Sequence, residues 1–259
     1  MANHGQILIG SVLLEKNRWT RPEKTPSFRV SDWLGRFAGA GLDGVELWQF
    51  HASRAEPGEV ERLAAGPLPM AVFNIYPTMT DAERGALDEC TALVSRLGVR
   101  GIKFNVGSEP GRRGEYLENL RRWRAALPKG VTPLCECHPG SIIEEPEAAA
   151  GFFEELGGEW PVIVHPFSRF ESLGRWLELF GPRVAHAHLQ MRDAEGKRVL
   201  RFDRRPEVAR EAVGMMRAAG YCGSWALEFA AGTGEPGESM EGLWAAALED
   251  LAFLRGLLK

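Results

Sequence analysis

The feature that most constrains this chain is the alternation of short apolar, β-branched runs with longer segments of helical periodicity. Eight such runs are predicted as strands, at residues 6–14, 44–50, 70–76, 101–106, 132–138, 162–166, 184–190 and 224–229. Between them, apolar residues recur every three or four positions, as at Cys90, Leu93, Val94 and Leu97, which is typical of amphipathic helices. This alternation predicts a parallel sheet covered by helices.

The length of the chain favours a closed barrel. Eight β/α units in 259 residues match a (β/α)₈ TIM barrel, a single domain spanning residues 1–259, with its active site at the C-terminal ends of the strands. The competing architecture is an open doubly wound sheet. It is disfavoured because no glycine-rich nucleotide-binding motif follows an early strand, and because the candidate polar residues come from many strands.

Composition excludes several classes of partner. Thirty-one Lys and Arg against 35 Asp and Glu give a net charge of -4, so no basic excess indicates a nucleic-acid partner. The four cysteines form no C-x-x-C pair and are expected to be reduced thiols. No apolar run reaches the roughly 18 residues of a membrane span, and the apolar N-terminal run lacks a basic leader. We therefore expect a soluble, cytoplasmic protein with no membrane partner.

Charged and imidazole side chains interrupt the predicted strands. Parallel strands are buried on both faces, so a charge within one is costly unless something compensates it. The interrupting residues are Glu46, Lys103, Glu136, His138, His165, His186, His188 and Glu228. Since side chains alternate along a strand, Glu136 and His138 are expected to share the lumen face, as are His186 and His188.

Four successive predicted strands, the fifth to the eighth, each provide a potential metal ligand near their C-terminal end. These ligands are Glu136, His165, His188 and Glu228. Two carboxylates with two imidazoles predict a divalent metal site, and the nitrogen donors favour Mn²⁺, Zn²⁺ or Co²⁺ over Mg²⁺. The alternative is a metal-free cluster of hydrogen-bonded polar side chains, which is the commoner explanation for any single buried histidine.

Four segments together resemble a known family. They are residues 40–47 (AGLDGVEL), 134–140 (LCECHPG), 186–189 (HAHL) and 220–228 (GYCGSWALE). Their order and spacing resemble the xylose isomerase-like TIM barrels, which include sugar-phosphate isomerases and epimerases, inosose dehydratases and, more remotely, endonuclease IV. The resemblance covers most of the chain. It implies metal ligands at Glu136, His188 and Glu228.

The chain departs from the family pattern at two places. On the sixth strand the family has an aspartate followed by Pro-x-His, whereas this chain has His165 in place of the aspartate and Ser168 in place of the later histidine. The exchange makes the site less negative and favours a nitrogen-preferring metal. The family's epimerases also place a catalytic glutamate six residues after the first ligand, where this chain has Ile142. A two-carboxylate proton shuttle therefore does not transfer.

The candidate catalytic residues are His138, Lys103 and Glu46. His138 is the first choice as the base, because it is expected one pleat beyond Glu136 toward the barrel mouth, although it is also suited to binding substrate. A buried Lys103 needs an anionic partner, and a structural ion pair with Glu46 is as plausible as a catalytic role. Glu46 is alternatively expected to orient the substrate.

Four further residues are predicted to bind substrate. Trp48 lies near the end of the second predicted strand, where an aromatic face can pack on sugar C–H groups, and Asn105 shares the face of Lys103. Arg192 and Arg198, in the polar loop after the seventh strand, are suited to an anionic group of the substrate. The alternatives are packing against helices for the tryptophan and simple solvation for the arginines.

These residues together predict a metal-dependent isomerase or epimerase. Its substrate would be a small carbohydrate or polyol, and the metal would stabilise an enediolate. One alternative is a dehydratase or other lyase acting on a keto-cyclitol or keto-acid, since the second family glutamate is missing. Another is a non-catalytic sugar-binding barrel. Endonuclease IV-like repair is disfavoured by net acidity and too few ligands for three metals. Family analogy also suggests a homo-oligomer.

Overall fold

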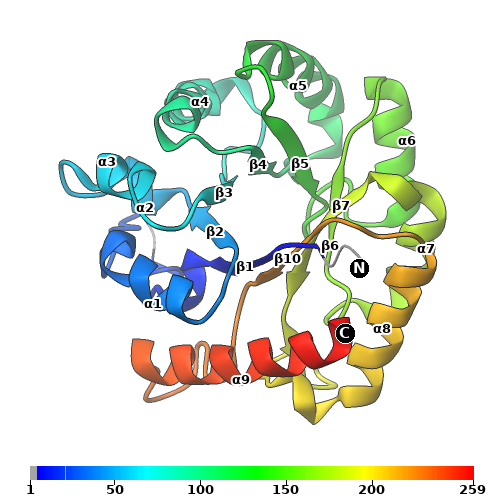
Figure 1. Ribbon diagram of the computed structural model, residues 1–259. Coiled ribbons are helices and arrows are strands. Elements are labelled where there is room, and N and C mark those ends of the chain that lie inside the picture. Colours follow the sequence, from blue (N-terminus) through cyan, green and yellow to red (C-terminus); the bar gives the residue numbers. More distant parts are fainter. Residues whose placement is uncertain (1–4, 21) are drawn as a thin grey trace.

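The computed structural model describes residues 5–20 and 22–259, and its strands form a closed barrel. All pairs in the barrel are parallel, in the order β1-β10-β7-β6-β5-β4-β3-β2, and β1 pairs with both β10 and β2 to close the cylinder. The strands are β1 (Ile7–Gly10), β2 (Gly44–Trp48), β3 (Met70–Asn74), β4 (Gly101–Phe104), β5 (Thr132–Glu136), β6 (Val162–Val164), β7 (Val184–Leu189) and β10 (Ser224–Leu227). The predicted (β/α)₈ TIM barrel is confirmed, and helices surround it (Figure 1).

The outer layer consists of helices with one apolar stripe each. They are α1 (Leu34–Gly39), α2 (Phe50–Ser53), α3 (Glu59–Ala64), α4 (Arg84–Leu97), α5 (Arg113–Ala126), α6 (Pro146–Leu156), α7 (Phe170–Phe180), α8 (Pro206–Ala218) and α9 (Met240–Leu258). In α4 the buried residues include Leu87, Cys90, Val94 and Leu97, which share one face. Within the described residues, no helix is both long and apolar enough to cross a membrane.

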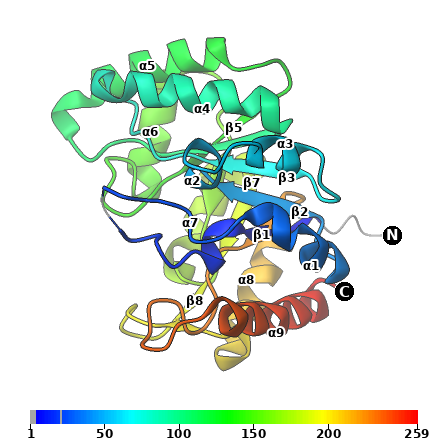
Figure 2. The same ribbon diagram turned by 90° about the vertical axis from the view of Figure 1, so that its left-hand side faces the viewer.

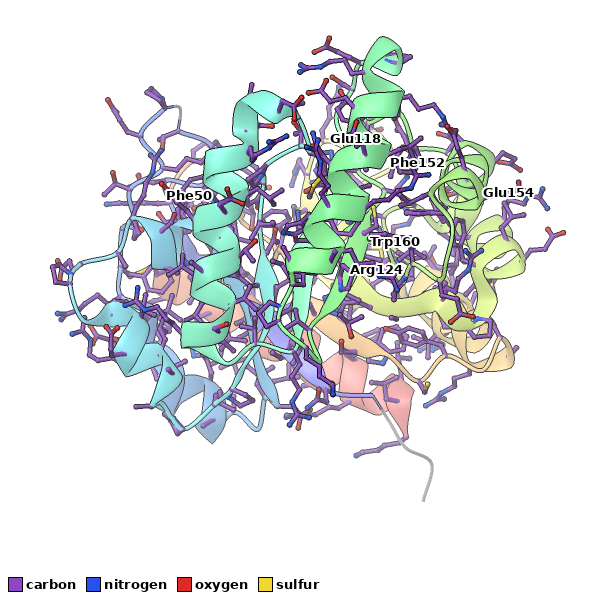
Figure 3. The ribbon with its side chains drawn as sticks, turned by 90° about the horizontal axis from the view of Figure 1, so that it is seen from above. Phe50, Glu118, Arg124, Phe152, Glu154 and Trp160 are labelled. Carbon is purple, nitrogen blue, oxygen red and sulfur yellow. The ribbon has the colours of Figure 1, made fainter. Side chains whose placement is uncertain are left out.

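Aromatic side chains join the outer helices to the barrel. The ring of Phe104, on β4, lies 5.2 Å from that of Trp123 and 5.9 Å from that of Trp160, edge to face in both cases. The guanidinium of Arg124, on α5, lies 4.6 Å from the centre of the Trp160 ring (Figure 3). These tryptophans therefore serve packing between helices and strands.

Each barrel strand ends earlier than its apolar run predicts. The first ends at Gly10, and Ser11–Leu14 forms a 3₁₀ turn. β5 ends at Glu136, where the backbone N–H of His138 donates to the Glu136 carbonyl at 2.8 Å and turns the chain. The neighbouring β6 has three residues and pairs with β5 only through Cys135 and Glu136. A strand without a ladder partner does not continue, and an apolar run alone does not show where the partner stops.

The lower part of the barrel lumen is filled by an apolar layer. Its buried members are Leu8, Val72, Leu134, Ile163 and Ala226. A Cβ at Gly101 would lie 3.1 Å from Leu134 Cδ1, so glycine at this position lets the larger side chains meet across the lumen. The next lumen-facing residue on most of these strands is polar. Among the lumen side chains, the buried charges therefore lie toward the C-terminal ends of the strands.

The loop after β7 folds into a hairpin at the barrel mouth. Its strands are β8 (Met191–Arg192) and β9 (Val199–Leu200), which pair antiparallel. Val199 is buried against Val12, Trp48 and Phe229, which follow β1, end β2 and follow β10, respectively. Figure 2 shows β8 at the end of the molecule opposite the C-terminus. This hairpin covers part of the C-terminal face.

A buried carboxyl in α9 makes stability depend on pH. Asp250 is 2% exposed; its Oδ1 accepts from the Phe202 backbone N–H at 2.8 Å, and its Oδ2 has no hydrogen-bond partner. Burial raises the pKa of Asp250 from 3.8 to about 7, against the opposing effect of the bond from Phe202. Because the pKa in the folded state exceeds that in the unfolded state, the folded protein binds more protons across this range. Stability therefore falls as the pH rises from about 4 to about 7.

We expect Asp250→Asn to remove this fall, since asparagine keeps the acceptor for Phe202 and carries no charge. Relative to the variant, the wild type should lose up to about 4 kcal/mol of unfolding free energy between pH 4 and pH 8. Urea unfolding at several pH values measures the difference. Asp88→Asn, on the exposed face of α4, is the control. Parallel curves for wild type and Asp250→Asn would contradict the assignment.

Candidate metal centre

Four side chains from adjacent barrel strands meet at the mouth. Glu136 is the last residue of β5, His165 follows β6, His188 lies in β7 and Glu228 follows β10. These strands are neighbours in the barrel. One donor atom from each side chain lies within 4.8 Å of the other three. The structure therefore brings together the four residues that the sequence suggests as metal ligands.

The four donors converge on a space beside the Nδ1 atom of His188. This atom lies 3.3 Å from Glu136 Oε1 and 3.6 Å from Glu228 Oε1. His165 Nε2 lies 3.2 Å from Glu136 Oε1 and 3.8 Å from Glu228 Oε2. His188 is fully buried, whereas His165 and Glu228 are each 9% exposed. The cluster is thus shielded from water and open on the side of His165 and Glu228.

Glu46, on β2, orients the two histidines of β7. Its Oε2 accepts from His186 Nε2 at 2.7 Å and from His188 Nε2 at 3.0 Å, and its Oε1 accepts from Asn74 Nδ2 at 2.8 Å. Burial alone would raise the pKa of Glu46, but the two imidazoles hold it well below its usual value. Because this carboxylate is ionised, each imidazole donates Nε2–H to it. In its neutral form, His188 then directs the lone pair of Nδ1 at the cluster.

Lys103, on β4, is the ionic partner of Glu136. Its Nζ lies 2.7 Å from Glu136 Oε2 and donates to Asn105 Oδ1 at 2.6 Å. Asn105 Nδ2 donates to the same Glu136 oxygen at 3.1 Å. The interpretation that Lys103 pairs with Glu46 is wrong, because β4 adjoins β5 while Glu46 is already bonded on β2. Glu136 Oε2 is thereby occupied, and Oε1 is left facing the two histidines.

The donor set fits a divalent cation. His188 Nδ1 is buried without a hydrogen-bond partner, and a lone pair facing two carboxylate oxygens is repelled unless a proton or a metal cation lies between them. Together with the residues that hold it, the cluster has three buried carboxylates, those of Glu46, Glu136 and Glu228, and one buried ammonium, that of Lys103. If the imidazoles are neutral, the net charge of these groups is −2. A divalent ion would neutralise them. The imidazole nitrogens favour Mn²⁺, Zn²⁺ or Co²⁺ over Mg²⁺.

Protons compete with a metal ion for this cluster. Burial lowers the pKa of His188, but the carboxylates of Glu46, Glu228 and Glu136 raise it well above its usual value. Burial raises the pKa of Glu136, but Lys103, His165 and His188 hold it well below its usual value. A proton and a metal ion would use the same lone pair of His188, so metal affinity should weaken in acid.

His138 lies outside the cluster. Its side chain is exposed, and its Nδ1 lies 2.7 Å from the Pro139 carbonyl oxygen. The alternation that would place it beside Glu136 stops because β5 ends at Glu136 and the chain turns. Ile142, at the position of the family's catalytic glutamate, is half-buried in the same loop. The structure therefore does not place His138 on the lumen face where the sequence analysis expected the base.

Trp48 and Asn105 have partners within the protein. Trp48 is 1% exposed, and its ring contacts Phe50 and His51 edge to face at 4.8 Å and 5.1 Å. Asn105 is 9% exposed and holds Glu136, as described above. Trp48 thus packs against other aromatic side chains at the barrel mouth, and Asn105 is the more accessible of the two.

The two arginines expected at the mouth lie in different environments. Arg198 is exposed on the hairpin and its Nε lies 3.2 Å from Glu235. Arg192 is half-buried on β8, and its Nε donates to Gln190 Oε1 at 2.9 Å. Only Arg192 is joined by hydrogen bonds to the residues around the cluster.

Sequence reasoning missed two polar residues that face the lumen, Asn74 and Gln190. Asn74 and Tyr76 continue the alternation that begins at Val72, and Gln190 continues that of His186 and His188. This period of two was the available signal, but these residues lie beside or beyond the strand ends. Burial and the nearby carboxylates raise the pKa of Tyr76 well above its usual value, so its hydroxyl remains protonated.

A Ser-His-Glu arrangement beside β2 has a structural role. Ser11 Oγ lies 2.9 Å from His51 Nδ1, and His51 Nε2 lies 2.9 Å from Glu15 Oε2. Ser11 Oγ also accepts from the backbone N–H of Trp48 at 2.9 Å. The three side chains are at most 1% exposed, so no substrate can reach the hydroxyl. The network connects the loop after β1 to β2.

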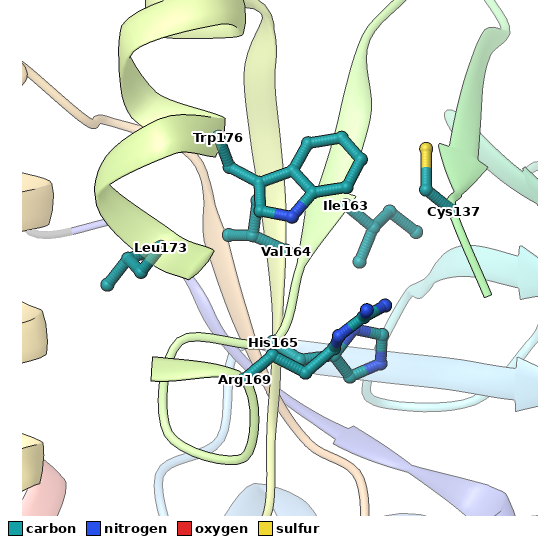
Figure 4. A pocket seen from close by; sticks show the side chains of 7 residues that line it. All are labelled: Cys137, Ile163, Val164, His165, Arg169, Leu173 and Trp176. Atoms are coloured by element: carbon teal, nitrogen blue, oxygen red, sulfur yellow. The ribbon is translucent and has the colours of Figure 1, made fainter. Parts of the chain in front are cut away.

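A small cavity lies behind His165, between β6 and α7. Its volume is about 10 Å³, and Cys137, Arg169 and Trp176 are among its lining residues (Figure 4). This is about the space that one water molecule needs. It is too small for a substrate.

Comparison with known proteins gives different results for sequence and structure. No family model matches the sequence. The chain is 27% identical over 173 residues to tRNA pseudouridine synthase B of Corynebacterium aurimucosum, which is 66% of this chain and 55% of that protein. The chain thus spans about half the length of this curated relative. Solved structures match over nearly the whole barrel, so they bear more directly on the fold.

Three solved structures illustrate the match. The probable 3-DHS dehydratase AsbF of Bacillus anthracis has a TM-score of 0.67 at 14% identity, covering 95% of this chain and 98% of that one. The 3-keto-D-glucoside 4-epimerase of E. coli has a TM-score of 0.66 at 15% identity, covering 97% and 99%. This chain has the xylose isomerase-like TIM-barrel fold. The IOLI protein, solved with a zinc atom, has a TM-score of 0.66 at 12% identity and covers 97% and 99%.

At these identities the likeness establishes the fold alone. The xylose isomerase-like resemblance seen in the sequence is therefore confirmed for the architecture of the barrel. The chemistry has to be argued from the side chains at the mouth.

Proposed function

We propose that this protein is a divalent-metal-dependent isomerase or epimerase of a small sugar or polyol derivative that carries a carbonyl group. The observation that carries the proposal is the convergence of Glu136, His165, His188 and Glu228 around an unpartnered, buried His188 Nδ1. Two imidazoles and two carboxylates with a surplus of negative charge are suited to a divalent ion. Two proteins of similar fold, a 3-keto-D-glucoside 4-epimerase and a probable 3-DHS dehydratase, agree with a small carbonyl substrate.

When bound, a divalent ion supplies a Lewis acid that polarises a carbonyl and stabilises the charge left when the adjacent carbon loses a proton. The chain's own residues prepare the site for this chemistry. Lys103 and Asn105 hold Oε2 of Glu136, and Glu46 fixes the ring of His188. The protonated hydroxyl of Tyr76, near the carboxylates, supplies a hydrogen-bond donor for a substrate oxygen.

A dehydratase is the second candidate, and one observation favours it. An epimerase that works by proton transfer needs groups on both faces of the reacting carbon, whereas an elimination needs one proton acceptor and one donor. In this chain Ile142 replaces the family's second glutamate, and His138 is exposed outside the cluster. The site therefore lacks, at these two positions, the second proton-transferring group that best distinguishes an epimerase.

Solvent isotope exchange tests the proposal. We expect the Mn²⁺-loaded protein, incubated in D₂O with ketoses, keto-glycosides and keto-cyclitols, to incorporate deuterium at the carbon next to the carbonyl of one substrate class. Glu228→Gln should abolish the incorporation. Mass spectrometry distinguishes the reactions, because isomerisation keeps all carbon and oxygen atoms of the substrate, whereas dehydration removes one oxygen as water. A metal-loaded protein that exchanges no carbon-bound hydrogen in any of these compounds would refute the proposal and support a non-catalytic sugar-binding barrel.

A further inference from the structure

Gln190 is a buried amide beside the proposed metal ligands. It follows the last residue of β7 and continues the lumen face of His186 and His188. The residue is 7% exposed. A buried glutamine is costly unless its amide is bonded, so the partners of each amide atom show what the residue does.

The amide of Gln190 connects the β8–β9 hairpin to the four candidate metal ligands. Its Nε2 donates to Glu228 Oε2 at 2.8 Å, and its Oε1 accepts from Arg192 Nε at 2.9 Å. Arginine only donates and an ionised carboxylate only accepts, so these two partners fix which end of the amide faces which. A flip of the amide would break both bonds.

This bond selects the oxygen of Glu228 that faces the cluster. With Oε2 held by Gln190, Oε1 lies 3.6 Å from His188 Nδ1. Glu136 is arranged in the same way, since Lys103 and Asn105 occupy its Oε2 and its Oε1 lies 3.3 Å from His188 Nδ1. In both carboxylates one oxygen is anchored and the other lies toward His188 Nδ1, while the anchored Oε2 of Glu228 also lies 3.8 Å from His165 Nε2.

We propose that Gln190 is a positioning residue of the metal site: oriented by Arg192, it anchors Glu228 so that one carboxylate oxygen is directed at the metal. The inference rests on the metal in the proposed function and deepens it, because it makes metal affinity depend on the β8–β9 hairpin that carries Arg192. Residues that do not touch the metal but hydrogen-bond to one of its ligands commonly change metal affinity by roughly 10–100-fold when they are removed.

The test compares two buried glutamines with Co²⁺ and Mn²⁺ as probes. Gln190→Met keeps the approximate length of the side chain and removes both hydrogen bonds. Gln49→Met is the matched control, because Gln49 is also 7% exposed but accepts from the Tyr76 backbone N–H at 2.9 Å instead of donating to Glu228. The dissociation constant, the visible Co²⁺ spectrum and the melting temperature without metal are measured for each protein.

We expect Gln190→Met to bind both ions roughly 10–100-fold more weakly than wild type, with an altered Co²⁺ spectrum. Arg192→Met should weaken binding less, and Gln49→Met should leave affinity within about threefold, because its bonds do not reach a ligand. Unchanged affinity in Gln190→Met would overturn the inference. Equal weakening in both glutamine variants would also overturn it, since the effect would then reflect packing.

The outcome for the wild type separates this inference from the proposed function. A wild type that binds neither Co²⁺ nor Mn²⁺ overturns both. A wild type that binds metal and shows the expected loss in Gln190→Met, yet exchanges no carbon-bound hydrogen, supports the positioning role and refutes the proposed reaction. A wild type that binds metal and catalyses exchange, with no change in Gln190→Met, refutes the positioning role alone.

Discussion

Glu136→Gln should lose the metal. We expect its affinity for Mn²⁺ or Zn²⁺ to fall by more than roughly 100-fold. This effect is larger than that of substituting a residue that only hydrogen-bonds to a metal ligand. Glu136 is the residue on which the cluster depends most, because its Oε1 faces both His165 and His188 while its Oε2 binds Lys103. Glutamine presents one neutral oxygen at best and leaves the ammonium of Lys103 without its counterion. Proton exchange should be abolished with the metal.

Elemental analysis of the purified protein and titration of the metal-free protein measure this effect. Glu145→Gln is the control, since its side chain is 66% exposed in the neighbouring loop and lies 3.5 Å from Arg169. The control should retain wild-type metal content. A Glu136→Gln protein that still binds one tight equivalent of metal would show that these four donors do not form the site.

Lys103→Met should be the most destabilising of the changes at the site. Lys103 is 1% exposed, and its removal leaves Glu136 buried without its cationic partner among three carboxylates. Removing one member of a buried ion pair costs about 3–5 kcal/mol. For a chain of this size that corresponds to a melting temperature lower by roughly 10 °C. A bound divalent ion would replace part of the missing positive charge, so Mn²⁺ should raise the melting temperature of the variant more than that of the wild type.

Thermal unfolding with and without Mn²⁺ measures both effects. Lys129→Met, an exposed lysine at the opposite end of the barrel, should change the melting temperature by no more than about 2 °C. If Lys103→Met melted like this control, the ammonium would not be compensating the carboxylates. If Mn²⁺ stabilised variant and wild type equally, the ion would bind away from Lys103.

Periodicity determined the fold and the face on which most of the polar strand residues lie. The spacing of apolar residues identified all the barrel strands, and the period of two placed Glu136 and His188 on the lumen side. These predictions succeed because burial on both faces of a parallel strand leaves few reasons for a charged residue other than a shared polar interior. Convergence at one end of the barrel then follows from the parallel direction of the strands.

Only the closed structure decided which groups are partners. Lys103 pairs with Glu136 instead of Glu46, because β4 lies directly beside β5, whereas β3 separates β4 from β2. His138 lies outside the lumen because β5 ends with its ladder partner, and Gln190 reaches Glu228 because β7 and β10 are neighbours in the barrel. A one-dimensional pattern specifies which face a side chain occupies. Where a strand ends and which atoms come within bonding distance depend on residues from other strands, and these are brought into contact only by folding.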